Sequence, residues 1–257
     1  KKRGIKLIIS ARDFPWDEPH QDSLQDWVAY TQNIVCKYYT EKVLIHGDPK
    51  YLPLVSDRVR MNNPSEVIKH LEDKIVYTGY VCNEKIKPHK KVNNHIFVST
   101  GLNKEEGMLV FREITKIASQ FPEYKFIMPI ANRYLKTIKM KTKDNIVMVP
   151  YIENMYEHLS SCSLYITYGG YNSTMEILKS GIPAIIIPRT DGQKMEQFVR
   201  CYTLESFNFF KVISKSEFNK FPSVIKSCLK SVNFPVKNSI DLNGVKKSYD
   251  AITKVYA

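Results

Sequence analysis

Short apolar runs alternate with amphipathic stretches along most of the chain. Runs typical of buried strands occur at 5–10, 43–46, 75–81, 95–101, 124–129, 146–151, 164–167 and 184–188. Apolar residues at helical spacing lie between them, at 24–39, 107–119, 154–161, 196–205, 215–230 and 242–256. Because strands and helices alternate, the pattern predicts an α/β fold with parallel sheets wrapped by helices, built as two Rossmann-like units.

A basic, polar stretch at 83–94 separates these two units, and we interpret it as a linker. The pattern therefore predicts a first domain at 1–82, the linker at 83–94, a second domain at 95–240, and a final helical segment at 241–257. A domain pair of this size is long enough to build real hydrophobic cores.

Composition narrows the class of protein. With 43% hydrophobic and 25% charged residues, the 257-residue chain has the profile of an ordinary globular protein. The net charge of +12 is concentrated after residue 80, where 26 Lys or Arg face 15 Asp or Glu. This excess suits an anionic ligand or an acidic membrane surface, although solvated surface lysines explain it equally well. No Arg/aromatic interleaving or RNA motif supports nucleic-acid binding, so we expect none.

Cysteine usage and hydropathy favour a cytoplasmic location. The five cysteines are odd in number and widely scattered, which indicates reduced thiols rather than a disulfide framework. No apolar run reaches the roughly 18 residues that a membrane helix needs. No His, Asp, Glu or Cys cluster has metal-ligand spacing, so we expect no metal and no cofactor.

The candidate chemistry lies where the strand at 164–167 meets a glycine turn, Gly169-Gly170. A helix follows and ends near Gly181. The sequence predicts Asn172 or Ser173 as its N-cap, with Ser173 and Glu176 forming a capping box. Glycines allow a phosphate to approach the backbone, and free amides at a helix start favour negative charge. The stretch predicts a cradle for a nucleotide diphosphate, with a tight ligand-free turn as the alternative.

These residues resemble a known family. The resemblance is carried by Gly169-Gly170-Tyr171-Asn172-Ser173-Thr174-x-Glu176-x-x-x-x-Gly181-x-Pro183, then Pro188-Arg189, then Glu196-Gln197-x-x-Arg200. Weaker matches are Ala11-Arg12-Asp13, His46-Gly47-Asp48-Pro49, Tyr77-Thr78-Gly79-Tyr80-Val81 and Asp241-Leu242-Asn243-Gly244. Together they are similar to GT-B glycosyltransferases of family 28. The resemblance implies two facing Rossmann-like domains: acceptor-side at 1–82, nucleotide-sugar-binding at 95–240, with the last helix packing back toward the first.

The resemblance also implies roles for individual residues. It implies that Glu176 accepts the ribose hydroxyls, with the capping role as the alternative. Glu196 and Gln197 would bind donor-sugar hydroxyls, with a solvated helix start as the alternative. The remaining expected contacts to the nucleotide sugar come from Thr100, Gly101, Tyr151, Ile152, Gly169, Gly170, Asn172, Ser173 and Thr174. For Tyr151 and Ile152, ordinary core packing is an equal alternative.

Transfer to an acceptor hydroxyl needs a general base. Asp13 and His46 both follow strands and are the candidates, although Asp13 would be structural if it pairs with Arg12. The expected reaction is a metal-independent, inverting transfer from a nucleotide diphosphate sugar, UDP being the expected nucleotide, with the helix start stabilising the leaving group.

The resemblance departs from the family at the start of the chain. Family members open with a further strand, a Gly/His-rich loop and about half of the acceptor domain, so we expect the first domain to be incomplete here. We expect either upstream residues or a partner chain to complete it. Two alternatives follow for the function: a nucleotide-sugar 2-epimerase or hydrolase, or a nucleotide-sugar-binding subunit that needs a partner. The acceptor is a glycan, a lipid-linked molecule or a small molecule, and a lipid-linked one would bring peripheral contact with the membrane.

Overall fold

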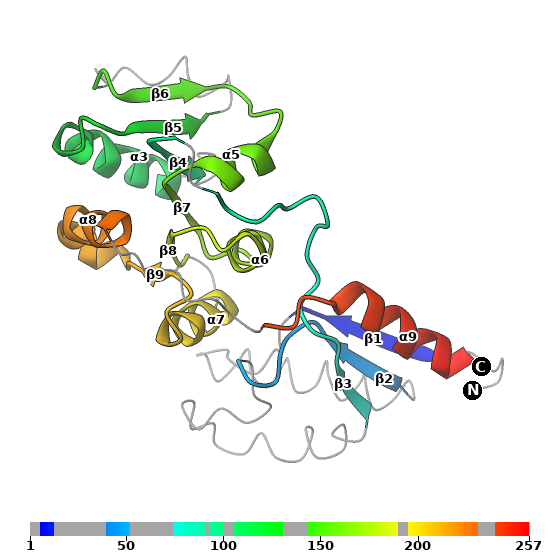
Figure 1. Cartoon of the computed structure of the whole chain (residues 1–257). Helices are drawn as coiled ribbons and strands as arrows, with labels where there is room; N and C mark the ends of the chain where they lie inside the picture. Colours follow the sequence, from blue (N-terminus) through cyan, green and yellow to red (C-terminus); the bar gives the residue numbers. More distant parts are fainter. Residues whose placement is uncertain are drawn as a thin grey trace. The chain divides into compact units, whose positions relative to one another are not determined.

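The computed structural model describes residues 6–12, 40–51, 74–90, 93–99, 105–130, 143–189, 195–230 and 240–256. The chain divides into two compact units (Figure 1). The first unit comprises Lys1–Cys82, Thr190–Thr203 and Ser239–Ala257, and the second comprises Asn83–Arg189 and Leu204–Asn238. Within the described residues, no helix is both long and apolar enough to cross a membrane.

The second unit is built on a six-stranded parallel sheet. Its strands in chain order are β4 (His95–Ser99), β5 (Lys125–Pro129), β6 (Ile146–Val149), β7 (Leu164–Tyr168), β8 (Ala184–Ile187) and β9 (Lys211–Val212). In space their order is β6-β5-β4-β7-β8-β9, so the chain moves outward in one direction from β4 and then in the other from β7. This is the strand order of a Rossmann fold.

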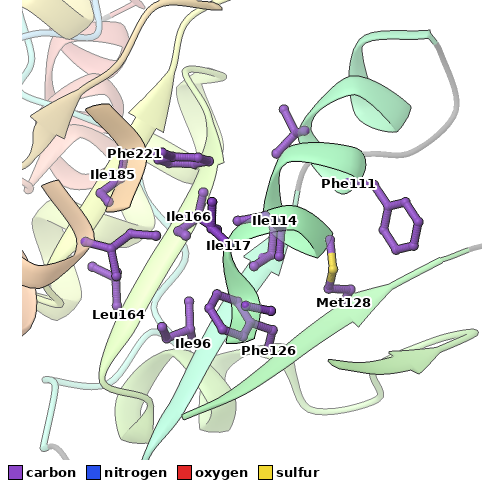
Figure 2. Packing of buried hydrophobic residues seen from close by; sticks show 14 of the residues in the cluster. Ile96, Phe111, Ile114, Ile117, Phe126, Met128, Leu164, Ile166, Ile185 and Phe221 are labelled. Atoms are coloured by element: carbon purple, nitrogen blue, oxygen red, sulfur yellow. The ribbon is translucent and has the colours of Figure 1, made fainter. Parts of the chain in front are cut away.

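Helices cover both faces of this sheet. They are α3 (Glu105–Ile117), followed by the 3-10 turn η3 (Ala118–Gln120), then α5 (Met155–Ser161), α6 (Tyr171–Ser180), the end of α7 (Met195–Ser206), η4 (Lys215–Lys220) and α8 (Phe221–Lys230). The main core lies between the sheet, α3 and α8, and Figure 2 shows Ile114 of α3 and Phe221 of α8 in it. Because side chains alternate along a strand, Leu164 and Ile166 of β7 enter this core while Tyr165 and Thr167 point to the opposite face.

Residues 83–90, part of the stretch 83–94 that we interpret from the sequence as a linker, lie along the second unit. The His89 amide donates to the Ser180 carbonyl at 2.7 Å, and the Lys90 amide donates to the Ser160 carbonyl at 2.7 Å. The His89 ring contacts the Cys162 carbonyl through Nε2 at 2.7 Å. This segment is therefore held against the ends of α5 and α6.

The first unit contains a three-stranded parallel sheet and the last helix. Its strands are β1 (Leu7–Ala11), β2 (Thr40–Ile45) and β3 (Ile75–Tyr77), in that spatial order, and its last helix is α9 (Gly244–Tyr256). The part of α7 up to Thr203 also belongs to this unit. The predicted helix at 24–39 lies outside the described residues.

A tight junction joins β3 to the segment before α9. The Tyr80 amide donates to the Asp241 carbonyl at 2.7 Å, and the Gly244 amide donates to the Tyr80 carbonyl at 3.1 Å. Gly79 has a φ of +79°, and a Cβ on Gly244 would lie 2.6 Å from the carbonyl oxygen of Gly79. Both positions therefore require glycine, Gly79 for its backbone conformation and Gly244 for the close approach of two segments of the chain.

Candidate functional site

The sheet of the second unit has one topological switch point, between β4 and β7. The two strands are neighbours in the sheet, pairing from Ile96 with Leu164 to Ser99 with Thr167, but the connections that follow them leave in opposite directions. Ligands of open α/β sheets bind in the crevice at the carboxyl ends of such strands. Here that edge carries Ser99, Thr167 and the turn into α6.

Helix α6 begins without a side-chain cap. Strand β7 extends through Tyr168, the helix begins at Tyr171, and Gly170 occupies the N-cap position with φ −62° and ψ 151°. The predicted N-cap at Asn172 or Ser173 is therefore wrong, because the strand and the two glycines bring the helix start forward. Glu176 is the sixth helical residue, too far along to serve in a capping box. The box that the structure does contain joins Ser214 and Glu217 at the start of η4.

The missing cap leaves a helix start suited to an anion. Both the amide and the hydroxyl of Thr174 donate to the Gly170 carbonyl at 3.0 Å, so neither is available to a ligand. The amides of Asn172 and Ser173 belong to the first turn, where the helix offers no carbonyl of its own, and they lie at the positive end of the helix dipole. A Cβ placed on Gly170 would have no neighbour within 4 Å among the residues that the structure describes. The helix start is thus open on the side where a phosphate would approach.

Glu176 is a buried carboxyl on the same helix. Only 8% of the residue is exposed, and its Oε2 atom has no hydrogen-bond partner among the described residues. Burial raises the pKa of Glu176 to about 7, against an opposing effect of the Tyr165 hydroxyl. A buried carboxyl oxygen without a hydrogen-bond partner lowers the stability of the folded protein. The Oε2 atom of Glu176 therefore indicates a ligand that donates hydrogen bonds to it.

Tyr165 was not among the residues expected from the sequence. It lies on β7 and is fully buried, yet its hydroxyl has no hydrogen-bond partner among the described residues. Burial raises the pKa of Tyr165 and the charge of Glu176 adds to the shift, while hydroxyls of Thr167, Ser173 and Ser99 oppose it. The available signal was a tyrosine inside Leu164-Tyr165-Ile166, since strands buried on both faces are normally aliphatic.

The other expected contacts are not all described. Asp13, Thr100 and Gly101 lie outside the described residues, as does the side chain of Glu196. Gln197 lies on α7 with its Oε1 atom buried and without a hydrogen-bond partner in the part of the chain that the structure describes, and its sugar-binding role stays a prediction. The structure thus brings together one group of expected residues, Gly169, Gly170, Asn172, Ser173, Thr174 and Glu176, at the start of α6.

Tyr151 and Ile152 follow β6, at the same carboxyl edge of the sheet. Tyr151 is 76% exposed, which excludes core packing as the reason for its presence, whereas Ile152 is half-buried. Their contact with a nucleotide base stays a prediction.

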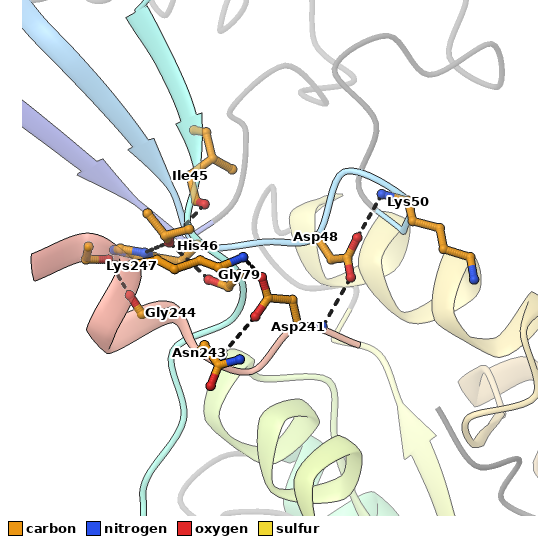
Figure 3. Close-up of polar contacts among 11 residues, drawn as sticks. Ile45, His46, Asp48, Lys50, Gly79, Asp241, Asn243, Gly244 and Lys247 are labelled. Carbon is orange, nitrogen blue, oxygen red and sulfur yellow. Dashed lines mark hydrogen bonds and ion pairs between the residues drawn. The ribbon is translucent and has the colours of Figure 1, made fainter. Parts of the chain in front are cut away.

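His46 follows β2 in the first unit, near the junction shown in Figure 3. Its Nε2 lies 2.7 Å from Ser10 Oγ and its Nδ1 lies 2.9 Å from Thr78 Oγ1. The Thr78 hydroxyl has one proton, which it directs to the Gly79 carbonyl at 3.0 Å or the Ile45 carbonyl at 3.3 Å. Thr78 therefore accepts the proton of Nδ1, and Nε2 is left as the acceptor.

Burial also lowers the pKa of His46, so the ring is neutral near pH 7. A neutral ring with a basic Nε2 has the protonation state of a general base. That nitrogen already contacts Ser10, however, so an acceptor hydroxyl would have to replace the serine hydroxyl as its partner.

An uncapped helix start beside a buried carboxyl, at the switch point of a Rossmann-like sheet, is the arrangement in which open α/β domains bind anionic ligands. Residues 81–254 match the model of the glycosyltransferase family 28 C-terminal domain. The chain therefore belongs to glycosyltransferase family 28, and the family resemblance seen in the sequence is confirmed.

Relatives and solved structures agree with this assignment. The chain is 28% identical over 148 residues to an uncharacterized UDP-glucosyltransferase, YojK, of Bacillus subtilis, covering 56% of this chain and 34% of that protein. It is 24% identical over 188 residues to the UDP-N-acetylglucosamine–N-acetylmuramyl-(pentapeptide) pyrophosphoryl-undecaprenol N-acetylglucosamine transferase of Oenococcus oeni, covering 65% of this chain and 50% of that one. The chain thus spans about a third to a half of these relatives.

Among solved structures, the glycotransferase of kitacinnamycin superposes with a TM-score of 0.67 at 11% identity, over 98% of this chain and 71% of that one. MurG of Acinetobacter baumannii superposes with a TM-score of 0.58 at 12% identity, over 87% and 76%. These structural neighbours confirm the predicted α/β fold class of the GT-B type.

Proposed function

We propose that the chain forms the donor-binding part of an inverting, metal-independent glycosyltransferase that takes its sugar from a UDP-linked donor. The observation that carries this proposal is the start of α6. It combines an uncapped first turn, open space beside Gly170 and a buried Glu176 carboxyl with one unused oxygen. A nucleoside diphosphate matches all three features, since its phosphates need amides and its ribose hydroxyls need an acceptor.

The same elements would assist the reaction. As the bond between the sugar and the diphosphate breaks, negative charge grows on the leaving phosphate, and the amides of Asn172 and Ser173 stabilise it together with the helix dipole. The Glu176 carboxylate fixes the ribose and so fixes the position of the diphosphate along the helix axis. The acceptor hydroxyl loses its proton to a base, for which Asp13 and His46 remain the candidates.

The choice of UDP rests on the relatives, several of which carry UDP or UDP-N-acetylglucosamine in their names. One structural neighbour is a rhamnosyltransferase in complex with thymidine diphosphate, which makes TDP the competing donor nucleotide. The glycan, lipid-linked or small-molecule nature of the acceptor stays open. A lipid-linked acceptor, as in the named undecaprenol transferases, would bring a cytoplasmic enzyme to the membrane surface.

A thermal-shift panel of UDP, TDP and GDP, each free and as a sugar conjugate, tests the proposal. UDP and UDP-sugars should raise the melting temperature most, because a ligand at about 100 times its Kd stabilises the folded state by about 2.7 kcal/mol. EDTA should leave the shift unchanged. Glu176→Gln should lower the affinity for UDP about tenfold or more, because a hydrogen bond to a charged group is worth roughly 1.5–3 kcal/mol.

The outcomes separate the alternatives. Stabilisation by TDP but not UDP would refute the choice of donor, and no response to any nucleotide would refute the site. Sugar-nucleotide turnover without an added acceptor would favour an epimerase or hydrolase. Tight UDP binding without turnover, followed by activity on adding a second polypeptide, would identify a binding subunit.

A further inference from the structure

Strand β7 places a large polar side chain directly beneath α6. Tyr165 has no exposed surface and lies on the sheet face opposite the aliphatic core, whereas its neighbours Leu164 and Ile166 enter that core. Its ring is fixed by stacking on Phe97, with centroids 5.5 Å apart and planes 20° apart. Phe97 stacks in turn on His158, at 5.9 Å and 16°. A ring packed in this way directs its hydroxyl to one place.

That place is the carboxyl edge of the switch point. The hydroxyl of Tyr165 lies near those of Ser99 at the end of β4, Thr167 at the end of β7 and Ser173 in the first turn of α6, and near the Glu176 carboxyl. Thr167 directs its own proton to the Ser99 carbonyl at 2.9 Å. Among the described residues, neither the buried Tyr165 hydroxyl nor the buried Glu176 Oε2 atom has a hydrogen-bond partner. Two such atoms from adjacent elements, a donor and an acceptor, form one incomplete polar cluster.

We propose that Tyr165 is the positioning residue for Glu176. Its hydroxyl donates a hydrogen bond to the Glu176 carboxylate and holds that carboxylate toward the ribose of the nucleotide. The proposal rests on the proposed function. A carboxylate has about four acceptor sites, and a ribose diol fills two of them. The Tyr165 hydroxyl, on the strand beneath α6, would be a third donor. It fixes the orientation of the carboxylate, and so of the lone pairs that face the ribose, and it stabilises the ionised form that the diol requires.

The other groups around Glu176 leave this role to Tyr165. Lys179, one turn further along α6, donates to the Asn83 carbonyl at 2.9 Å. His158 on α5 lies behind Phe97 in the stack. Among the described residues, the Tyr165 hydroxyl is the group that favours the ionised form of Glu176 against burial.

Calorimetric titration with UDP between pH 5.5 and 8.5 tests the proposal on Tyr165→Phe, which keeps the ring and removes only the hydroxyl. Wild-type affinity should rise with pH as Glu176 ionises. In the variant, affinity should fall severalfold at neutral pH and the midpoint of the rise should move to higher pH. Tyr124→Phe, the same change just before β5 at the opposite edge of the sheet, is the matched control and should alter neither quantity.

A double-mutant cycle adds a second readout. If Tyr165 acts through the carboxyl, Tyr165→Phe should cost little further affinity in the Glu176→Gln background, where UDP binding should also be independent of pH. Equal losses in both backgrounds, or a Tyr165→Phe protein with wild-type affinity and an unmoved midpoint, would overturn the positioning role while leaving the proposed function intact. A wild-type protein that does not bind UDP would overturn both.

Discussion

Replacing Glu176 with glutamine should stabilise the protein above neutral pH while it weakens nucleotide binding. The carboxyl is 8% exposed and burial raises its pKa to about 7 from an ordinary value of 4.5. Since the folded-state pKa is the higher one, the stability associated with this group is fully present below pH 4.5 and is lost as the pH rises through 7. Glutamine carries no charge at any pH and does not suffer this loss.

The shift sets the size of the effect. At about 1.4 kcal/mol per pKa unit, ionising the buried carboxyl costs about 3 kcal/mol at pH 8 and about 1 kcal/mol at pH 5. Urea unfolding followed by circular dichroism at the two pH values should therefore show a gain for Glu176→Gln that is larger at pH 8 by roughly 2 kcal/mol.

The control is Glu157→Gln, at an exposed position on α5, which removes a charge without relieving burial. It should show little difference between the two pH values. If the Glu176 variant and wild type lose stability in parallel from pH 5 to pH 8, the carboxyl is not a buried charge, and the argument that it awaits a ligand fails with it. A gain in stability with a loss of UDP affinity is the result expected of a group kept for binding.

Three further changes probe other parts of the structure. Gly170→Val should fold normally, because a Cβ there meets no neighbour within 4 Å, but it should abolish UDP binding in calorimetry; retained binding would contradict the phosphate position. Gly244→Ala should lower stability by about 1–3 kcal/mol in urea unfolding, because its Cβ would lie 2.6 Å from the backbone of Gly79 and Tyr80; a wild-type midpoint would disprove the close approach. Gln197→Ala should preserve UDP affinity and alter the preference among UDP-sugars in competition assays, and an unchanged preference would show that the sugar is bound elsewhere.

Much of the second unit could be predicted from its hydrophobic pattern because its strands β7 and β8 are buried on both faces. The runs at 164–167 and 184–188 correspond to β7 and β8, and Gly181 ends α6 with the positive φ of +69° expected of a helix C-cap. Strand β9, Lys211–Val212, escaped prediction because two residues carry no periodicity. Its place in the sheet depends on pairing with β8, which is information from the tertiary structure.

The candidate site was predictable in identity and only partly in geometry. The glycine pair and Glu176 were recognisable from residue types and spacing, but Ser173 and Glu176 fit a capping box equally well on sequence alone. The end of β7 at Tyr168 decides between a capping and a ligand-binding role for Glu176. With the helix starting at Tyr171, Glu176 is too far along α6 to cap it, and its side chain is buried. The contribution of Tyr165 required knowledge of which strand face lies beneath α6, because the alternation of side chains gives two faces and does not say which helix covers each.

The junction at Gly79 and Gly244 has a consequence for the order of folding. The Asp241 amide donates to Asp48 Oδ2 at 3.2 Å, which joins positions 193 residues apart, and all segments of the second unit lie between them. The second unit can therefore fold in a chain that lacks residues 239–257, whereas the first unit cannot be completed without α9. In a chain truncated after residue 238, limited proteolysis should find the second unit protected and the first digested; protection of both would refute this order. In such a chain β1, β2 and β3 lack the segment that fastens β3, so the first unit is the part of the molecule that depends most on protection from aggregation.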